Sequence, residues 1–183
     1  MSQVSAQRRR KGSRYNLLGM LGALGLAFAC LLIFLPAAYS SNPLFFIDTF
    51  VSSRPALVTV YYEGWQASFD SSDPEFDLLV DGAYESIASQ NGFISMGWSE
   101  RRFNQARTEG IALEMFYDEP VVLPGNRVDI GDVRRLFIPL DVFGSGNPWV
   151  VFRGGDDLYW GDPIRLSNME PVRQAVEQVA QDR

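Results

Sequence analysis

The chain has 183 residues, of which 46% are apolar and 13% aromatic, and it carries a formal net charge of −6. It contains no histidine and one cysteine, which excludes Ser-His-Asp and Cys-His nucleophiles, histidine-containing zinc sites and an intrachain disulfide. The charge is uneven, because residues 1–15 hold five of the 16 basic side chains and none of the 22 acidic ones. The remaining, acidic part repels the phosphates of nucleic acids, so we expect no nucleic-acid partner.

An uncharged run of 22 residues, Leu17 to Ala38, follows the basic tail. As an α-helix, such a run spans about 33 Å at about 1.5 Å per residue, which is enough to cross a hydrocarbon core of about 30 Å. The nearby positive charge all precedes the run, and the positive-inside rule then keeps the N-terminus in the cytoplasm. We predict a single-pass protein of a cytoplasmic membrane, with a basic cytoplasmic tail (1–15), a transmembrane helix (16–39), a juxtamembrane linker (40–56) and an extracytoplasmic domain (57–183).

Two other interpretations of this segment compete with a retained anchor. A basic start, an apolar stretch and small residues before Ser41 also occur in a cleaved signal peptide, but there the apolar region has about 7 to 15 residues. Lipid attachment at Cys30 is disfavoured because Leu31 to Leu35 continue the apolar run. The length of the run favours the anchor, while cleavage near Ser41 stays open.

Small residues recur on one side of the expected membrane helix. Gly19, Ala23 and Ala27 are spaced four residues apart, which places them on one face, where another helix can approach closely. We interpret this face as a surface for helix packing. The alternative is that glycine and small residues are frequent in membrane helices in any case.

The outer domain begins with a strand and the clearest helix of the chain. Residues 57–62 are rich in β-branched and aromatic side chains, which predicts a strand. Residues 71–75 offer N-cap oxygens and a proline suited to a first helical turn. The following apolar residues recur at three- and four-residue steps and predict an amphipathic helix: Phe76, Leu79, Val80, Ala83, Tyr84, Ile87 and Ala88.

Further strands and one more helix are expected in the rest of the domain. Residues 99–108 are ambiguous between a helical turn and a loop. After residue 167 or 168, an apolar stripe of Met169, Val172, Val176 and Val179 predicts a final helix. The expected strands cover 93–98, 110–117, 119–123, 135–140, 149–153 and 158–160. The predicted fold class is α+β: an N-terminal transmembrane helix, then a small, mainly antiparallel sheet of about four to six strands packed by about two helices.

Carboxylates are the only side chains left as a plausible catalytic pair, because histidine is absent and Cys30 lies in the apolar run. Two carboxylates can act as acid and base when they face each other, but adjacent acids in a Gly-Gly-Asp-Asp stretch are more typical of a turn. Calcium prefers oxygen ligands, yet no acidic group here has the spacing of an EF-hand. We expect neither a metal nor a cofactor. The candidate acids are Asp156 and Asp157, then Glu114, Asp118 and Glu119, and for calcium Asp70, Asp73 and Asp77, or Asp129 and Asp132.

Aromatic residues in or beside the predicted strands are the remaining candidates for binding. Exposed Trp and Tyr stack on sugars and anchor protein interfaces, because they offer a large contact area and a polar tip. The alternative is that most of them belong to the core of a sheet closed by two helices. The binding candidates are Trp65, Trp98, Trp149, Tyr159 and Trp160.

These features favour one function over two others. The leading hypothesis is a non-enzymatic accessory or assembly subunit of a prokaryotic envelope, which binds a partner protein in the membrane or envelope. The second is an envelope glycan-binding module that uses exposed Trp and Tyr, and the third is a carboxylate-based hydrolase. The sequence contains no motif that identifies the partner, the sugar or the oligomeric state.

Overall fold

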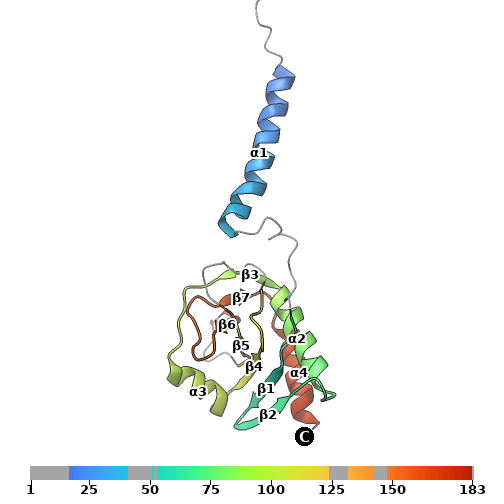
Figure 1. Cartoon of the computed structure of the whole chain (residues 1–183), viewed down its shortest axis with the longest axis vertical. Coiled ribbons are helices and arrows are strands. Elements are labelled where there is room, and N and C mark those ends of the chain that lie inside the picture. The colour runs from blue at the N-terminus through green and yellow to red at the C-terminus, as the bar shows by residue number, and fades with distance from the viewer. Residues whose placement is uncertain (1–16, 41–50, 52, 124–131, 142–147, 183) are drawn as a thin grey trace, which may run out of the picture. The chain divides into compact units, whose positions relative to one another are not determined.

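The computed structural model describes residues 17–40, 51, 53–123, 132–141 and 148–182. In the first of these ranges, side chains are described for residues 19–31. The chain divides into two units, Met1–Pro43 and Leu44–Arg183. Figure 1 labels the helices and strands of both units.

The first unit contains one helix, α1 (Leu17–Ser40), among its described residues, in agreement with the helix expected there. The described side chains of α1 are exposed, and they include the face formed by Gly19, Ala23 and Ala27. The crossing of a bilayer by this segment stays a prediction from the sequence. Within the described residues, no helix is both long and apolar enough to cross a membrane.

The second unit has the predicted α+β class and contains an antiparallel sheet of seven strands in the order β2-β1-β4-β5-β6-β7-β3. All neighbouring strands are antiparallel. Figure 1 shows α2 and α4 beside each other and α3 apart from them. The strands are β1 (Leu57–Tyr62), β2 (Trp65–Phe69), β3 (Gln90–Phe93), β4 (Ile111–Phe116), β5 (Arg135–Pro139), β6 (Val150–Gly154) and β7 (Ile164–Leu166), and the helices are α2 (Phe76–Ala88), α3 (Glu100–Glu109) and α4 (Glu170–Gln181).

The two faces of the sheet carry different cores. The larger core lies between the sheet and the α2–α4 layer, and it includes Val60 of β1, Leu79 of α2 and Val176 of α4. The smaller core joins α3 to the other face through Phe103 and Ala106, which contact mainly aromatic side chains of the strands. Because side chains alternate along a strand, each central strand contributes to both cores.

The predicted helix at 76–88 is confirmed as α2, whose apolar stripe is buried. Its other face is exposed, and there Asp77 and Asp81 each accept a 2.7 Å hydrogen bond from Arg54. The predicted side-chain cap is wrong: Glu75 occupies the N-cap position and makes no capping bond. The Asp73 carboxylate instead accepts a 2.8 Å bond from the Asp70 amide, which closes the turn before the helix.

The final helix is also confirmed, and its contact with α2 is close. Gly82 of α2 lies against the first turn of α4: a Cβ at Gly82 would be 2.9 Å from the Pro171 carbonyl oxygen and 3.0 Å from the Ala175 Cβ. A larger residue at Gly82 would therefore push the two helices apart. The predicted stripe of α4 is buried beneath this contact: Met169, Val172, Val176 and Val179.

The sheet has more strands than predicted, mainly because a tight hairpin was missed. Glu63 and Gly64 both have positive φ values, 48° and 87°, which is the backbone of a type I′ hairpin turn. This turn brings β2 back along β1. The short β7 was also missed, since three residues carry too little alternation to predict a strand.

Three other strand predictions need correction. β3 ends at Phe93, where the predicted strand began, and Ile94 instead donates to the Pro163 carbonyl outside any ladder. Residues 119–123 form no strand, in keeping with the missing amide hydrogen of Pro120. Around residue 159 there is one isolated bridge to Gly154. The ambiguous stretch 99–108 forms most of α3.

The buried stripe of α2 gives a direct test of the fold. We expect Leu79→Asp to lower the free energy of unfolding by about 4 kcal/mol or more, because it buries a charge without a partner in the larger core. Asp81→Ala, on the exposed face, should change it by less than about 0.5 kcal/mol. Thermal unfolding of the full-length protein in mild detergent, followed by near-ultraviolet circular dichroism, measures both. Equal stability of the two variants would contradict the orientation of α2.

Candidate functional site

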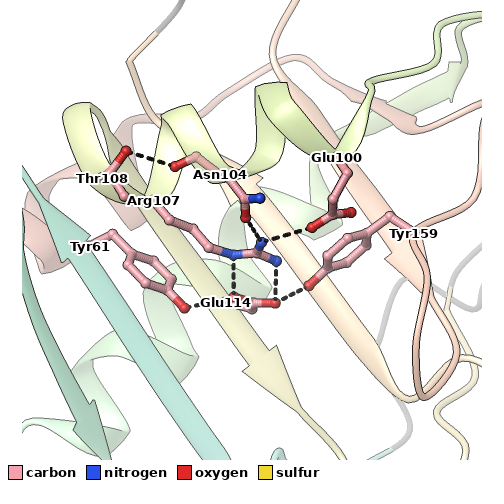
Figure 2. A network of polar contacts seen from close by, with 7 residues as sticks. All are labelled: Tyr61, Glu100, Asn104, Arg107, Thr108, Glu114 and Tyr159. Carbon is pink, nitrogen blue, oxygen red and sulfur yellow. Dashed lines mark hydrogen bonds and ion pairs between the residues drawn. The ribbon is translucent and has the colours of Figure 1, made fainter.

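The most concentrated group of polar contacts on the α3 side of the sheet surrounds Glu114 of β4, whose side chain is 2% exposed. Along β4, Leu113 and Met115 face the larger core, so alternation directs Glu114 to the α3 side. Arg107 of α3, Tyr61 of β1 and Tyr159 converge on this carboxylate, as Figure 2 shows. We call these four residues the Glu114 network.

Both oxygens of Glu114 are occupied by donors. The Arg107 guanidinium donates from Nε to Oε2 and from Nη2 to Oε1, each at 3.1 Å. The Tyr61 hydroxyl donates to Oε2 at 2.9 Å, and the Tyr159 hydroxyl donates to Oε1. A two-pronged guanidinium–carboxylate contact is both stronger and more restricted in geometry than a neutral hydrogen bond. Each carboxylate oxygen therefore accepts two hydrogen bonds within the network.

Arg107 is held in place from its own helix as well. Its Nη1 donates to Asn104 Oδ1 at 3.0 Å and lies 3.6 Å from Glu100 Oε1 (Figure 2). The guanidinium carbon also lies 5.4 Å from the centre of the Phe137 ring, a distance at which the ring face attracts a cation. The side chain of Arg107 is 20% exposed, so one edge of the network reaches the surface through this residue.

An aromatic cluster beneath α3 surrounds the buried part of the network, where Glu114 and Tyr61 are 2% and 7% exposed. The rings of Phe103 and Tyr159 are stacked with centres 4.7 Å apart. Phe137 meets Phe103 edge-on at 5.3 Å. In such surroundings an unpaired charge costs several kcal/mol, and the pairing of Glu114 with Arg107 is what makes its burial tolerable.

The environment holds both tyrosines in their protonated form. Burial raises the pKa of Tyr61, and the negative charge of Glu114 raises it further. The same two causes, in the same order, raise the pKa of Tyr159. Burial alone would lower the pKa of Arg107, but its hydrogen bonds with Glu114 and the charge of Glu114 raise it above the usual value. At neutral pH the network is therefore one anion held by one cation and two neutral donors.

The chemistry that this geometry supports is attachment of α3 to the sheet. A general base needs a free lone pair within reach of a substrate proton, and a metal ligand needs one directed at the ion. The Glu114 lone pairs are all directed at protein donors. We conclude that the network acts as a polar clamp between α3, β1 and β4.

The other candidate carboxylates do not join Glu114. Asp118 and Glu119 are exposed just beyond β4, and Asp156 lies 3.6 Å from the Arg134 Nε. Asp157 is exposed in the turn after β6. In the second group Glu114 is therefore buried while Asp118 and Glu119 are exposed, and both members of the first group, Asp156 and Asp157, are exposed.

The calcium candidates are also dispersed. Asp70 and Asp73 bond within the turn before α2, while Asp77 pairs with Arg54. Asp132 is exposed, and Asp129 lies outside the described residues. Over the part of the chain that the structure describes, no three acidic or cysteine side chains are close enough together to hold a metal ion.

The five aromatic candidates belong to different parts of the domain. Trp65 and Trp160 pack against the larger core, whereas Trp98 and Tyr159 pack against the smaller one. The Arg102 guanidinium carbon lies 4.5 Å from the centre of the Trp98 ring, which Phe103 and Phe152 also contact. Trp149 is the most exposed of the five, at 37%, so the five do not form one stacking surface.

Sequence reasoning missed Arg107 and Tyr61, and it named Glu114 for a different reason. A signal was present, because Glu114 is the one charged residue inside the strand sequence Ile-Ala-Leu-Glu-Met-Phe. A carboxylate in such a strand needs a buried cation.

Comparison of the chain with protein-family models, with curated proteins and with solved structures found no match.

The clamp can be tested by neutralising its anion. We expect Glu114→Gln to lower the free energy of unfolding by about 3 kcal/mol, because it leaves the buried part of Arg107 without a counterion. Glu100→Gln is the matched control, since Glu100 also approaches Arg107 but is 64% exposed, and we expect a loss below about 0.5 kcal/mol. Denaturant unfolding of the full-length protein measures both. Similar losses in the two variants would show that the network does not stabilise the fold.

The raised tyrosine pKa values predict sensitivity to alkali. Above about pH 10 the folded state keeps protons that an unfolded chain loses, so the free energy of unfolding falls as pH rises there and is unaffected by these groups below that pH. We expect a fraction of the tyrosines to ionise only together with loss of near-ultraviolet dichroism. Ionisation of every tyrosine in a folded domain would contradict this. The residues concerned are Tyr61, Tyr84, Tyr117 and Tyr159.

Proposed function

We propose that this protein is a membrane-anchored accessory or assembly subunit, which binds a partner protein through its outer domain and catalyses no reaction itself. The uncharged run of 22 residues after a basic tail supports the anchor. The orientation follows from the same charges, with the N-terminus in the cytoplasm and the domain outside. The single-pass arrangement suits a subunit that must stay beside a partner in the membrane.

The occupied carboxylate of Glu114 is the observation that carries the non-enzymatic part of this proposal. Glu114 accepts hydrogen bonds from Arg107, Tyr61 and Tyr159. Protonation or metal binding at this carboxylate would first have to break these bonds, each of which is assisted by the charge. A hydrolase built on Glu114 would therefore lose its own structural clamp.

The glycan-binding alternative has weaker support. A sugar platform needs an accessible aromatic face, and the Trp98 ring is already covered by Arg102. Trp149, with 37% exposure, is a single exposed ring, and the other four candidates are partly buried. The face formed by Gly19, Ala23 and Ala27 adds a route to protein contacts instead, through helix packing in the membrane.

The proposal is tested by purifying the full-length protein from native membranes in mild detergent and analysing the complex by mass spectrometry. We expect a membrane or envelope protein at a fixed stoichiometry. A lone protein that retains glycan would instead support the second hypothesis. As a matched comparison, a variant with Leu at Gly19, Ala23 and Ala27 tests whether the small-residue face contributes to the complex.

The proposed orientation predicts a specific protease pattern. Protease added to intact cells, or to spheroplasts where an outer barrier exists, should digest the domain and spare the tail and span. Replacing the five basic residues of the tail with neutral ones should lower the fraction with this orientation, because the charge bias is lost. A domain that is protected until the membrane is broken would contradict the orientation, and a mature chain that begins near Ser41 would replace the anchor by a cleaved signal.

A further inference from the structure

The two outer strands of the sheet differ in how well they are protected. At one edge, β3 has an irregular register between Gln90 and Phe93, and Gly92 there has a φ of +123°. Such distortions prevent another strand from pairing with an edge. At the other edge, β2 keeps an uninterrupted register with β1 along all five of its residues. It contains no charged residue and no proline, and these are the usual protective devices of an edge.

No strand among the described residues pairs with the outer side of β2, and the backbone groups on that side can be assigned from the pairing with β1. Glu63 donates to the Gly110 carbonyl at 2.9 Å, which fixes the alternation so that Tyr62 directs its own backbone groups toward Trp65 of β2. Trp65 and every second residue after it then bond to β1. Gln66 and Ser68 direct their N–H and C=O groups outward, and both residues are exposed.

We infer that the open edge of β2 is the surface that receives the partner, by addition of an extended strand from the partner protein. This inference rests on the proposed function and names the contact that it needs. Strand addition gives affinity through main-chain hydrogen bonds and specificity through alternate side chains. The outward groups of Gln66 and Ser68 supply two donors and two acceptors for such a strand.

The charges around β2 define the chemistry of that strand. β2 itself is uncharged, but Glu63 precedes it and Asp70 follows it, and both are exposed. A strand with a basic residue at each end therefore complements this edge. Its central residues should alternate between apolar and polar, since Ala67 and its neighbours on one face pack on the larger core whereas Gln66 and Ser68 occupy the other.

A second copy of the chain fits this edge less well. Antiparallel pairing of two β2 strands about Ala67 brings Glu63 of each copy close to Asp70 of the other. In this pairing Glu63 lies opposite Ser71 of the other copy and Asp70 opposite Gly64, so the two acids are one position out of register, and like charges this close repel each other. The charge pattern thus favours a different protein with basic flanks.

The inference is tested first with a peptide and the full-length protein in mild detergent. The probe has five residues of alternating valine and threonine, flanked by lysine at both ends, and its binding is measured by calorimetry. We expect the same peptide with glutamate ends to bind at least about tenfold more weakly, a difference of about 1.4 kcal/mol. A peptide N-methylated on all five central residues, which can donate no backbone hydrogen bond from either edge, should not bind. Equal binding of the three peptides would overturn the inference.

A matched pair of variants then tests the position. Gln66→Pro removes one outward N–H at an edge, where proline is tolerated, and we expect at least about tenfold weaker binding of the lysine-flanked peptide. Gln66→Thr keeps the N–H and should bind within about twofold of the parent. Unchanged binding by a folded Gln66→Pro variant would overturn the inference. If this variant fails to fold, the binding of the N-methylated and unmethylated peptides to the parent protein still tests the inference.

The outcomes separate this inference from the proposed function. If the folded Gln66→Pro variant retains a stoichiometric partner, the edge of β2 is not the contact and the inference is overturned, while the accessory function stands. Selective peptide binding without any native partner overturns the accessory function and supports an open edge. If the parent protein is a dimer and the Gln66→Pro variant is a monomer, a second copy of the chain occupies this edge, and the inference that a different protein binds there is overturned.

Discussion

The burial of one carboxylate is the constraint on which the α3 side of the domain depends. Glu114 is 2% exposed, and a lone charge in that position would cost several kcal/mol, which is a large part of the stability of a small domain. Arg107 supplies the balancing charge from α3, so the helix must lie where its guanidinium reaches β4. The stacked rings of Phe103 and Tyr159 then fill the space that this position leaves. The pairing of Glu114 with Arg107 and the packing of the aromatic rings therefore both fix the position of α3 on the sheet.

This arrangement divides the domain into two layers with different roles. The α2–α4 layer covers the larger core mainly with aliphatic side chains, and its two helices are joined there by a 3.2 Å hydrogen bond from the Val172 amide to the Ser86 hydroxyl. The α3 layer is smaller, and its directional contacts specify one geometry among the many that an aromatic cluster alone would allow. The helices cover the two faces, and among the described residues β2 and β3 are the outer strands of the sheet. The regular register of β2 makes that edge suited to receive another strand.

Anchoring and strand addition would reinforce each other in a membrane protein. An anchor confines two proteins to one surface, so a second, weaker contact becomes effectively intramolecular. The few outward backbone groups at Gln66 and Ser68 would contribute little to affinity between two freely diffusing proteins. They are enough when a membrane segment already keeps the partner nearby. A modest edge contact is therefore consistent with an accessory subunit.

The sequence by itself determined the features that depend on local spacing. The charge asymmetry and the apolar run are visible in the sequence itself. The apolar stripes of α2 and α4 follow from the three- and four-residue spacing of apolar residues that is typical of an amphipathic helix. The tertiary structure decided which distant residues meet. Tyr61 is 53 residues from Glu114, and Tyr159 is 45 residues from it, and no local pattern encodes such pairs. Strand order, the polar clamp and the open edge all depend on these long-range pairings, because register in a sheet is set by the whole buried face rather than by one strand.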